Sequence, residues 1–138
     1  MILIVCVDEK NGMLFNNRRQ SKDRNLIEHI LNKIGSKKLW LTDFSKDLFL
    51  IKPCNNIIID NNLIEKIEKD EYCFIEDIDI STIIDKVDKI IVYNWNRHYP
   101  ADTYFDISMD EWVIESETNI VGFSHENITE KIYSRGNK

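Results

Sequence analysis

The amino-acid sequence predicts an α/β protein with a mostly parallel sheet, and three observations carry that prediction. Two continuous apolar, β-branched runs, "ILIVCV" (2–7) and "KIIVYNW" (89–95), are typical of strands buried on both faces of a sheet. Residues 22–34 between them repeat apolar side chains at helical spacing. The chain then closes on two segments that alternate apolar and polar side chains, 111–117 and 127–135, as an antiparallel pair does.

The long helix is predicted by a start signal, an apolar stripe and a stop signal. Ser21 stands just before residues 22–34 and belongs to the preferred helix-capping residues, while Gly35 follows the last apolar position. The apolar positions that share one side are Leu26, Ile27, Ile30, Leu31 and Ile34. We therefore expect this side of the helix to pack on one face of the sheet.

Shorter elements are expected in the remaining segments. Apolar runs predict further strands at 38–42, 56–60 and 71–77. One helical turn is expected at 45–49 behind Ser45, and a second short helix at 82–87 behind Ser81. The result is a mixed sheet, mostly parallel with a C-terminal antiparallel hairpin, flanked by one long and two short helices.

The composition is that of one compact domain spanning residues 1–138. The chain is 43% hydrophobic and 30% charged, and its four glycines and two prolines leave no room for a long linker. The first thirty residues contain no signal-like apolar segment, so we expect a cytoplasmic protein with no membrane association. Cys6, Cys54 and Cys73 are odd in number, and two lie in or beside apolar runs, as buried free thiols do.

Charge and histidine spacing argue against two classes of partner. The net charge of −6 opposes general nucleic-acid binding, because a duplex carries dense negative charge. His29, His98 and His125 are scattered without the spacing of zinc ligands, and there is no Cys-x-x-Cys pair. We expect neither general nucleic-acid binding nor a metal site.

Several segments, taken in their order along the chain, resemble the dihydrofolate reductase family. The start "ILIVCVDEKNGMLFNN" is similar to its first strand and glycine-containing loop, and "SKDRNLIEHI" to the opening of its first helix. "PCNNIIID" resembles the strand after its second helix. "DKIIVYNWNRHYPADTYFDISMDEWVIESE" followed by "SHENITEKIYSR" resembles its last three strands, with Asp102, Thr103 and Phe105 in the connecting loop. The resemblance implies a shortened dihydrofolate reductase-like fold.

The resemblance makes Asp23 the candidate catalytic acid, at the place where the family holds the amino-pyrimidinone edge of a pterin. A carboxylate there can accept two N–H bonds. Three positions depart from the family. Ile27 replaces a pterin-stacking aromatic, Tyr93 replaces the threonine that bonds to the acid, and Cys54 replaces the arginine that binds the folate tail. We therefore expect an altered pocket. An acid in the first turn also stabilises a helix by ~0.3–1 kcal/mol whatever its function.

The resemblance also implies that an active member would use NADPH, bound at two glycine-containing turns. Those places read "LTDFSKD" and "FIEDIDIS" here, and no glycine occurs between Gly35 and Gly122. Their acids, which would repel a polyphosphate, are Asp43, Asp47, Glu76, Asp77 and Asp79. We expect no cofactor, with NADPH as the alternative.

The segments "VCVDEKNGMLFNNRRQSKDR" and "NWNRHYPAD" are also similar to short bacterial proteins labelled ribonuclease Z. True ribonuclease Z enzymes use a His-x-His-x-Asp-His metal motif, which this sequence lacks. The label therefore has no chemical support in these residues.

A basic segment, "RRQSKDR", surrounds the predicted start of the helix in an otherwise acidic protein. Guanidinium groups and helix N–H groups suit a phosphate, a carboxylate or an acidic partner surface. The ligand-binding candidates are Arg18, Arg19, Lys22, Arg24 and the neighbouring Asn17. An exposed mobile loop is the alternative interpretation.

Three functions are compatible with these observations. The leading hypothesis is a non-catalytic or repurposed dihydrofolate reductase-like protein that binds a small anionic ligand or a protein partner at the Asp23 and Arg18–Arg19 loop. The first alternative is an NADPH-dependent reductase of a pterin-like substrate. The second is a small adaptor or immunity-type protein. The absence of glycine at the phosphate turns favours the non-catalytic hypotheses.

Overall fold

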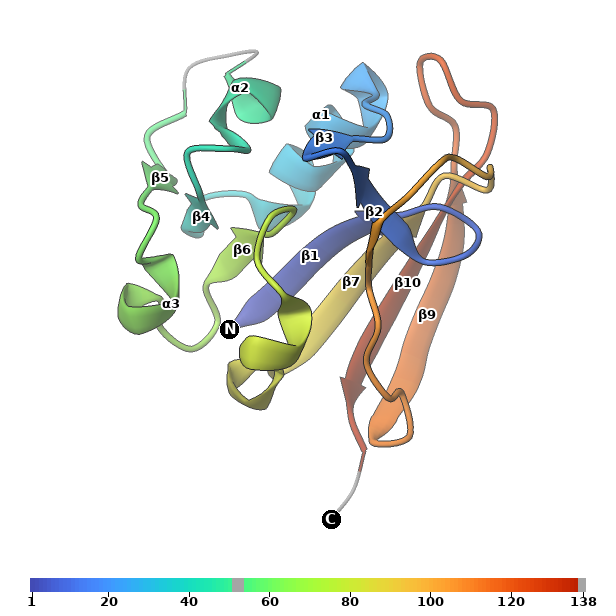
Figure 1. The fold of residues 1–138 in the computed structure, drawn as a ribbon. Helices are drawn as coiled ribbons and strands as arrows, with labels where there is room; N and C mark the ends of the chain where they lie inside the picture. Colours follow the sequence, from blue (N-terminus) through green and yellow to red (C-terminus); the bar gives the residue numbers. More distant parts are fainter. Residues whose placement is uncertain (51–53, 137–138) are drawn as a thin grey trace.

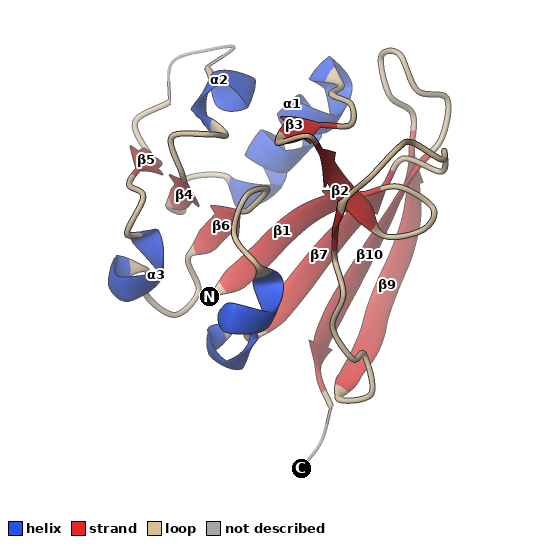
Figure 2. Ribbon diagram, in the orientation of Figure 1, coloured by secondary structure: helices blue, strands red, loops and turns tan. Residues whose placement is uncertain are grey.

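The computed structural model describes residues 1–50 and 54–136, and its main element is a seven-stranded sheet (Figure 1). Across the sheet the strands lie in the order β5 (Ile57–Ile59), β4 (Leu39–Leu41), β6 (Tyr72–Phe74), β1 (Ile2–Val7), β7 (Lys89–Asn94), β10 (Ile128–Arg135) and β9 (Trp112–Ile120). The strands from β5 to β7 pair in parallel, while β10 is antiparallel to both its neighbours. The predicted mostly parallel sheet with an antiparallel C-terminal hairpin is confirmed (Figure 2).

The two most apolar runs of the sequence form the centre of this sheet. β1 pairs with β7 along its whole length, from Ile2 opposite Lys89 to Val7 opposite Asn94. Alternate side chains of β1 enter two separate cores, Leu3 on one face and Ile4 on the other. Burial on both faces explains why the run is continuously apolar instead of alternating.

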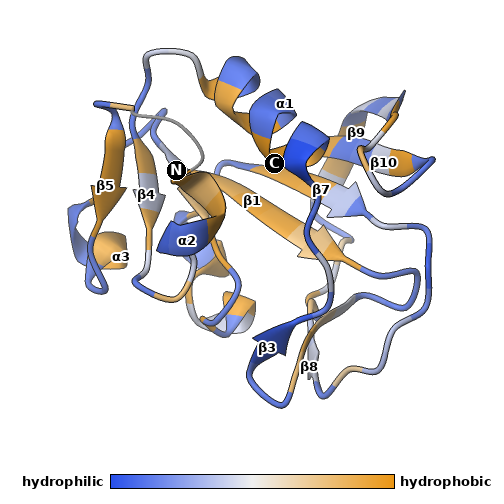
Figure 3. Cartoon of the chain, turned by 90° about the horizontal axis from the view of Figure 1, so that it is seen from above, coloured by the Kyte–Doolittle hydropathy of each residue, from blue (hydrophilic) through white to orange (hydrophobic). Residues whose placement is uncertain are grey.

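Helix α1 (Arg24–Ile34) covers one face of the sheet, and its apolar stripe is buried as predicted (Figure 3). The predicted stop is also confirmed, because Gly35 has a φ of 63° and its N–H donates to the Leu31 carbonyl at 3.1 Å. The predicted capping residue is wrong. Asp23, not Ser21, is the N-cap, and its Oδ1 accepts the N–H of Leu26 at 3.2 Å. A carboxylate at this position satisfies a helix N–H that would otherwise lack an acceptor.

The short helices agree only in part with the sequence prediction. Helix α2 (Lys46–Phe49) follows Ser45 as expected, but the Ser45 hydroxyl donates to Glu76 (2.7 Å) instead of capping the helix. The predicted helix at 82–87 consists of two 3₁₀ turns, Ile80–Thr82 and Ile84–Lys86. Asp79, not Ser81, caps the first of them. Helix α3 (Leu63–Lys66) was not predicted, because one turn leaves too short a pattern to recognise.

A small second sheet, also not predicted, carries part of the basic segment. Its strands are β3 (Arg18–Arg19), β2 (Gly12–Phe15) and β8 (Thr103–Tyr104). β2 and β3 form a hairpin whose two turn residues, Asn16 and Asn17, have φ values of 52° and 61°. Asparagine tolerates this left-handed conformation, so "NN" is a hairpin signal. Asp102 accepts the Asn16 N–H at 3.1 Å and joins β8 to the hairpin.

Two further features concern the cysteines and the length of the helices. Cys6, Cys54 and Cys73 are free, and Cys73 is buried. Within the described part of the chain, every helix is too short or too polar to cross a lipid bilayer.

Candidate functional site

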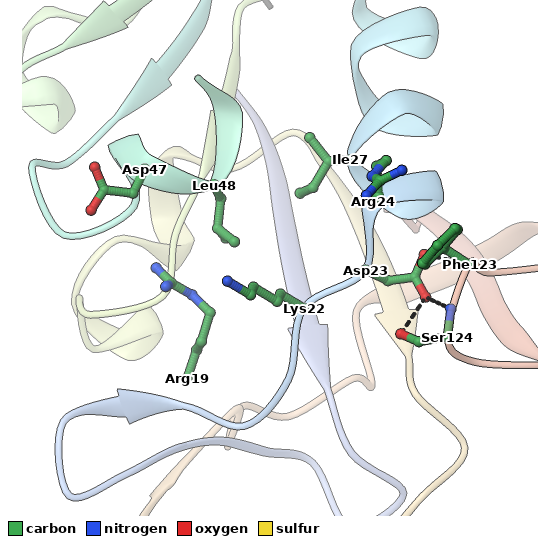
Figure 4. A pocket seen from close by; sticks show the side chains of 9 residues that line it. All are labelled: Arg19, Lys22, Asp23, Arg24, Ile27, Asp47, Leu48, Phe123 and Ser124. Atoms are coloured by element: carbon green, nitrogen blue, oxygen red, sulfur yellow. Dashed lines mark hydrogen bonds between the residues drawn. The ribbon is translucent and has the colours of Figure 1, made fainter. Parts of the chain in front are cut away.

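A cavity of about 420 Å³ opens beside the start of α1 (Figure 4). Its apolar walls are Ile27 of α1, Leu48 of α2 and Phe123 of the loop before β10. Its polar lining residues are Arg19, Lys22, Asp23, Arg24, Asp47 and Ser124. Figure 4 shows the ends of Arg19 and Lys22 directed into the space between α1 and α2. An apolar space with a few converging polar groups is the usual form of a small-molecule site.

Asp23 is buried, with 3% of its surface exposed, and the chain itself satisfies its carboxylate. Besides the Leu26 N–H, Oδ1 accepts the Phe123 N–H (2.8 Å), and Oδ2 accepts the Ser124 N–H (2.9 Å) and the Nδ1–H of His125 (2.8 Å). Burial alone would raise the pKa of Asp23, but these hydrogen bonds outweigh it and hold the pKa below its usual range. Asp23 is therefore an ionised anchor for the loop before β10.

Gly122 permits the close approach of this loop to Asp23. A Cβ atom at Gly122 would lie 2.6 Å from Oδ2 of Asp23 and 2.7 Å from the His125 carbonyl oxygen. The Gly122 N–H donates to that same carbonyl at 2.8 Å. Only glycine leaves room for the turn that brings Phe123 and Ser124 to the cavity.

Arg19 is the cation most firmly held at the cavity. Its Nε and one terminal nitrogen donate to the two carboxylate oxygens of Glu76 at 2.9 and 2.8 Å, and the same terminal nitrogen reaches the Phe44 carbonyl at 3.2 Å. The hydrogen bond to Glu76 is the main reason why the pKa of Arg19 is raised. This two-point ion pair fixes the guanidinium and neutralises most of its charge.

Lys22 and Arg24 remain available to a ligand. Arg24 is exposed and stacks its guanidinium on the Phe123 ring, 4.6 Å from the ring centre. Lys22 is exposed, and its ammonium has no hydrogen bond or ion pair within residues 1–50 and 54–136. Lys22 and Arg24 are thus the two cations of the cavity lining that no carboxylate pairs within the described part of the chain.

The predicted ligand-binding residues are only partly brought together. Arg19, Lys22 and Arg24 line the cavity with Asp23, whereas Arg18 and Asn17 do not. Arg18 faces a separate hollow, which Arg19 also lines, and Asn17 lines a groove on another side. Successive side chains of a strand point to opposite faces, which explains why Arg18 of β3 does not reach the cavity with Arg19. The ligand roles of all six residues, Asp23 included, stay predictions.

Three residues of the site were missed by sequence reasoning, namely Leu48, Phe123 and Ser124. Phe123 and Ser124 lie about a hundred positions from Asp23 along the chain. The one local signal in the sequence was Gly122, which ends the long glycine-free stretch. In the structure the next residue, Phe123, has 64% of its surface exposed. Exposure of a large aromatic side chain is a hint of function that the sequence alone does not reveal.

Comparison with known proteins identifies the fold. No family model and no curated protein matches the sequence. Among solved structures, the chain is similar to a dihydrofolate reductase from Enterococcus faecalis, solved in complex with NADP(H) and RAB-propyl. The TM-score is 0.69 at 14% sequence identity, over 99% of this chain and 96% of that chain. The chain has a dihydrofolate reductase-like fold. At this identity the likeness concerns the fold alone.

The acidic turns that follow β4 and β6 in this dihydrofolate reductase-like protein form hydrogen bonds and an ion pair with other residues of the chain. Thr42, which follows β4, donates to Asp77 (2.9 Å), and Glu76, which follows β6, is paired with Arg19. Beside them lies a groove of about 660 Å³. Its acidic residues are Asp77, Asp79, Asp102 and Asp106. An anionic ligand would meet repulsion along this groove.

Proposed function

We propose that the protein is a repurposed dihydrofolate reductase-like protein that binds a small organic anion in the cavity at the start of α1. The observation that carries this proposal is the Lys22 ammonium beside apolar walls, which no other described residue binds. An ammonium without a partner among the described residues gains more from a ligand anion than Arg19, whose charge is already shared with Glu76.

The other residues that line the cavity indicate which further groups the ligand should carry besides its anion. Ile27, Leu48 and Phe123 would cover an apolar or aromatic body, and burying Phe123 would remove an exposed ring from water. Asp47 is exposed on the side of the cavity away from Phe123, and its carboxylate can accept a hydrogen bond from a donor on the ligand (Figure 4). We therefore expect a ligand with an apolar body, an anionic group and a hydrogen-bond donor. An acidic segment of a protein partner would meet the same requirements.

Replacement of Lys22 with methionine should weaken binding at least about tenfold, because a hydrogen bond to a charged group contributes about 1.5–3 kcal/mol. The ligands are found by a thermal-shift screen of aromatic and aliphatic carboxylates, phosphorylated metabolites, pterins and folates. A ligand at roughly 100 times its Kd stabilises the protein by about 2.7 kcal/mol. Titration calorimetry then compares the wild type with Lys22→Met.

The matched control is Lys37→Met, which removes an exposed lysine beyond the far end of α1. It should bind like the wild type. Equal affinity of Lys22→Met and the wild type, or preference for the neutral amide of a carboxylate ligand, would contradict the proposal.

NADPH should show no saturable binding below roughly millimolar concentration, because the groove beside the phosphate turns is lined by four aspartates. The measurement is titration of NADPH followed by fluorescence or calorimetry, with NADH beside it. Micromolar binding would instead favour the alternative, an NADPH-dependent reductase of a pterin-like substrate.

A further inference from the structure

Ser21, His125 and Asp23 form an unbroken line of hydrogen-bonding side chains. The Ser21 Oγ lies 2.9 Å from Nε2 of His125, and Nδ1 of His125 lies 2.8 Å from Oδ2 of Asp23. Because the Asp23 carboxylate only accepts, Nδ1 carries the hydrogen of this contact. In the neutral ring Nε2 then offers its lone pair to the Ser21 hydroxyl.

We propose that Ser21, His125 and Asp23 act as nucleophile, general base and orienting acid in the hydrolysis of a small carboxylic ester. Each residue has the contact that its role requires. The nucleophile bonds to the base, and the base bonds through its other nitrogen to a buried carboxylate. Such a constellation is recognised by its geometry, and it occurs on unrelated folds.

The base is rigidly held. His125 is 4% exposed and stacks on Trp95, with ring centres 4.6 Å apart. The Tyr99 hydroxyl lies 3.4 Å from Nε2. Asp8, itself buried, accepts from the Tyr99 N–H and from Gln20, the residue before Ser21, both at 3.1 Å. Catalytic groups need such support, because small misplacements cost large factors in rate.

The nucleophile lies beside the cavity. Ser21 is half-buried and lines a small recess that shares Lys22, Ile27 and Leu48 with the lining of the cavity. The backbone N–H of Lys22, directly after the nucleophile, donates to no acceptor within residues 1–50 and 54–136. In the proposed reaction this N–H and the Lys22 ammonium would donate to the developing oxyanion.

The reaction balances with water as the only co-reactant. Ser21 Oγ bonds to the ester carbonyl carbon while its proton passes to Nε2 of His125. The bond from that carbon to the alcohol oxygen breaks, and the alcohol leaves with the proton. Water then attacks the acyl-serine and gives one proton to Nε2, which returns it to Ser21 as the acid departs. The products are one carboxylic acid and one alcohol.

The choice of ester rests on the proposed function, whereas the triad does not. If the cavity binds an organic anion, the preferred ester carries a negative group near Lys22 and an apolar body against Ile27 and Phe123. Calorimetry with Lys22→Met tests the anion site, and covalent labelling of Ser21 tests the triad. One can fail while the other succeeds.

The test is labelling of the folded full-length chain with a fluorophosphonate, mapped by mass spectrometry, together with hydrolysis of p-nitrophenyl acetate. We expect one adduct per chain, on Ser21, and at least about a 100-fold loss of hydrolysis in Ser21→Ala. The control Ser116→Ala removes an exposed serine of β9 and should leave both signals unchanged. Thermal unfolding checks that each variant is folded.

His125→Gln provides a second, independent variant. With the base absent, Ser21 should stay unlabelled in protein that still gives a cooperative unfolding transition. Absence of labelling in the wild type, an adduct on any residue other than Ser21, or hydrolysis by Ser21→Ala within about twofold of the wild type would overturn the proposal.

Discussion

Replacing Asp23 with alanine should lower the free energy of unfolding by about 3–5 kcal/mol, because each buried donor that is left without an acceptor costs about 1–3 kcal/mol. Asp23 accepts hydrogen bonds from the backbone of Leu26, Phe123 and Ser124 and from the His125 ring. Its loss leaves these donors without an acceptor and removes the α1 cap. Urea unfolding followed by circular dichroism measures the change.

Asp47→Ala is the matched control, because Asp47 lines the same cavity but is exposed. It should change the free energy of unfolding by no more than about 0.5 kcal/mol. The pKa of Asp23 is lower in the folded chain, so its stabilisation is present above the ordinary aspartate pKa of about 3.9. It is lost as the pH falls towards the folded value. A loss below about 1 kcal/mol in Asp23→Ala at pH 7 would contradict the anchoring role.

Replacing Glu130 with glutamine should lower the free energy of unfolding by about 3 kcal/mol at pH 7 and by much less near pH 2. Glu130 is 4% exposed on β10. Its Oε2 accepts from the Tyr93 hydroxyl (2.7 Å) and from Nε2 of His29 (2.8 Å), with the Lys33 ammonium at 3.4 Å. Burial alone would raise its pKa, but the His29, Tyr93 and Lys33 contacts lower it from 4.5 to about 2.

The sign of the pH effect on stability follows from the lowered pKa of Glu130. A carboxylate with a lowered pKa stabilises the fold above pH 4.5, and that contribution disappears as the pH falls to about 2. Urea unfolding of the wild type and Glu130→Gln between pH 7 and pH 2 should therefore show curves that converge. The control Glu117→Gln, on the exposed strand β9, should follow the wild type at every pH. Parallel curves would disprove the role of Glu130.

The structure explains why a tyrosine stands at position 93, where the dihydrofolate reductases have a threonine. The resemblance noted in the sequence places Tyr93 where dihydrofolate reductases have a threonine that bonds to the pterin-binding acid. Here the Tyr93 hydroxyl bonds to Glu130 of the neighbouring strand instead. Asp23 obtains its partners from the 122–125 loop. Asp23, the predicted counterpart of that acid, therefore has its hydrogen-bond partners in a loop and not in Tyr93.

The cavity itself could be predicted only in part. The basic segment and Asp23 were identified from local sequence, because charge clusters and helix starts are contiguous features. The "NN" hairpin signal could have shown that Arg18 does not reach the cavity with Arg19, since neighbouring side chains of a strand point to opposite faces. Apart from the neighbouring Gly122, no local signal indicated the contribution of Phe123, because its place depends on a contact with Asp23, a hundred residues away.

The sequence by itself determined the central strands β1 and β7, the buried stripe of α1 and its end at Gly35. Hydrophobic periodicity and backbone preference are properties of neighbouring residues, so they can be read without the fold. Only the tertiary structure decided that Asp23 caps α1, that Arg19 pairs with Glu76, and that His125 joins Ser21 to Asp23. A hydrogen bond needs two groups within about 3 Å and in line. No local pattern specifies which distant side chain will meet that condition, because the packing of the whole sheet and its loops sets the distance.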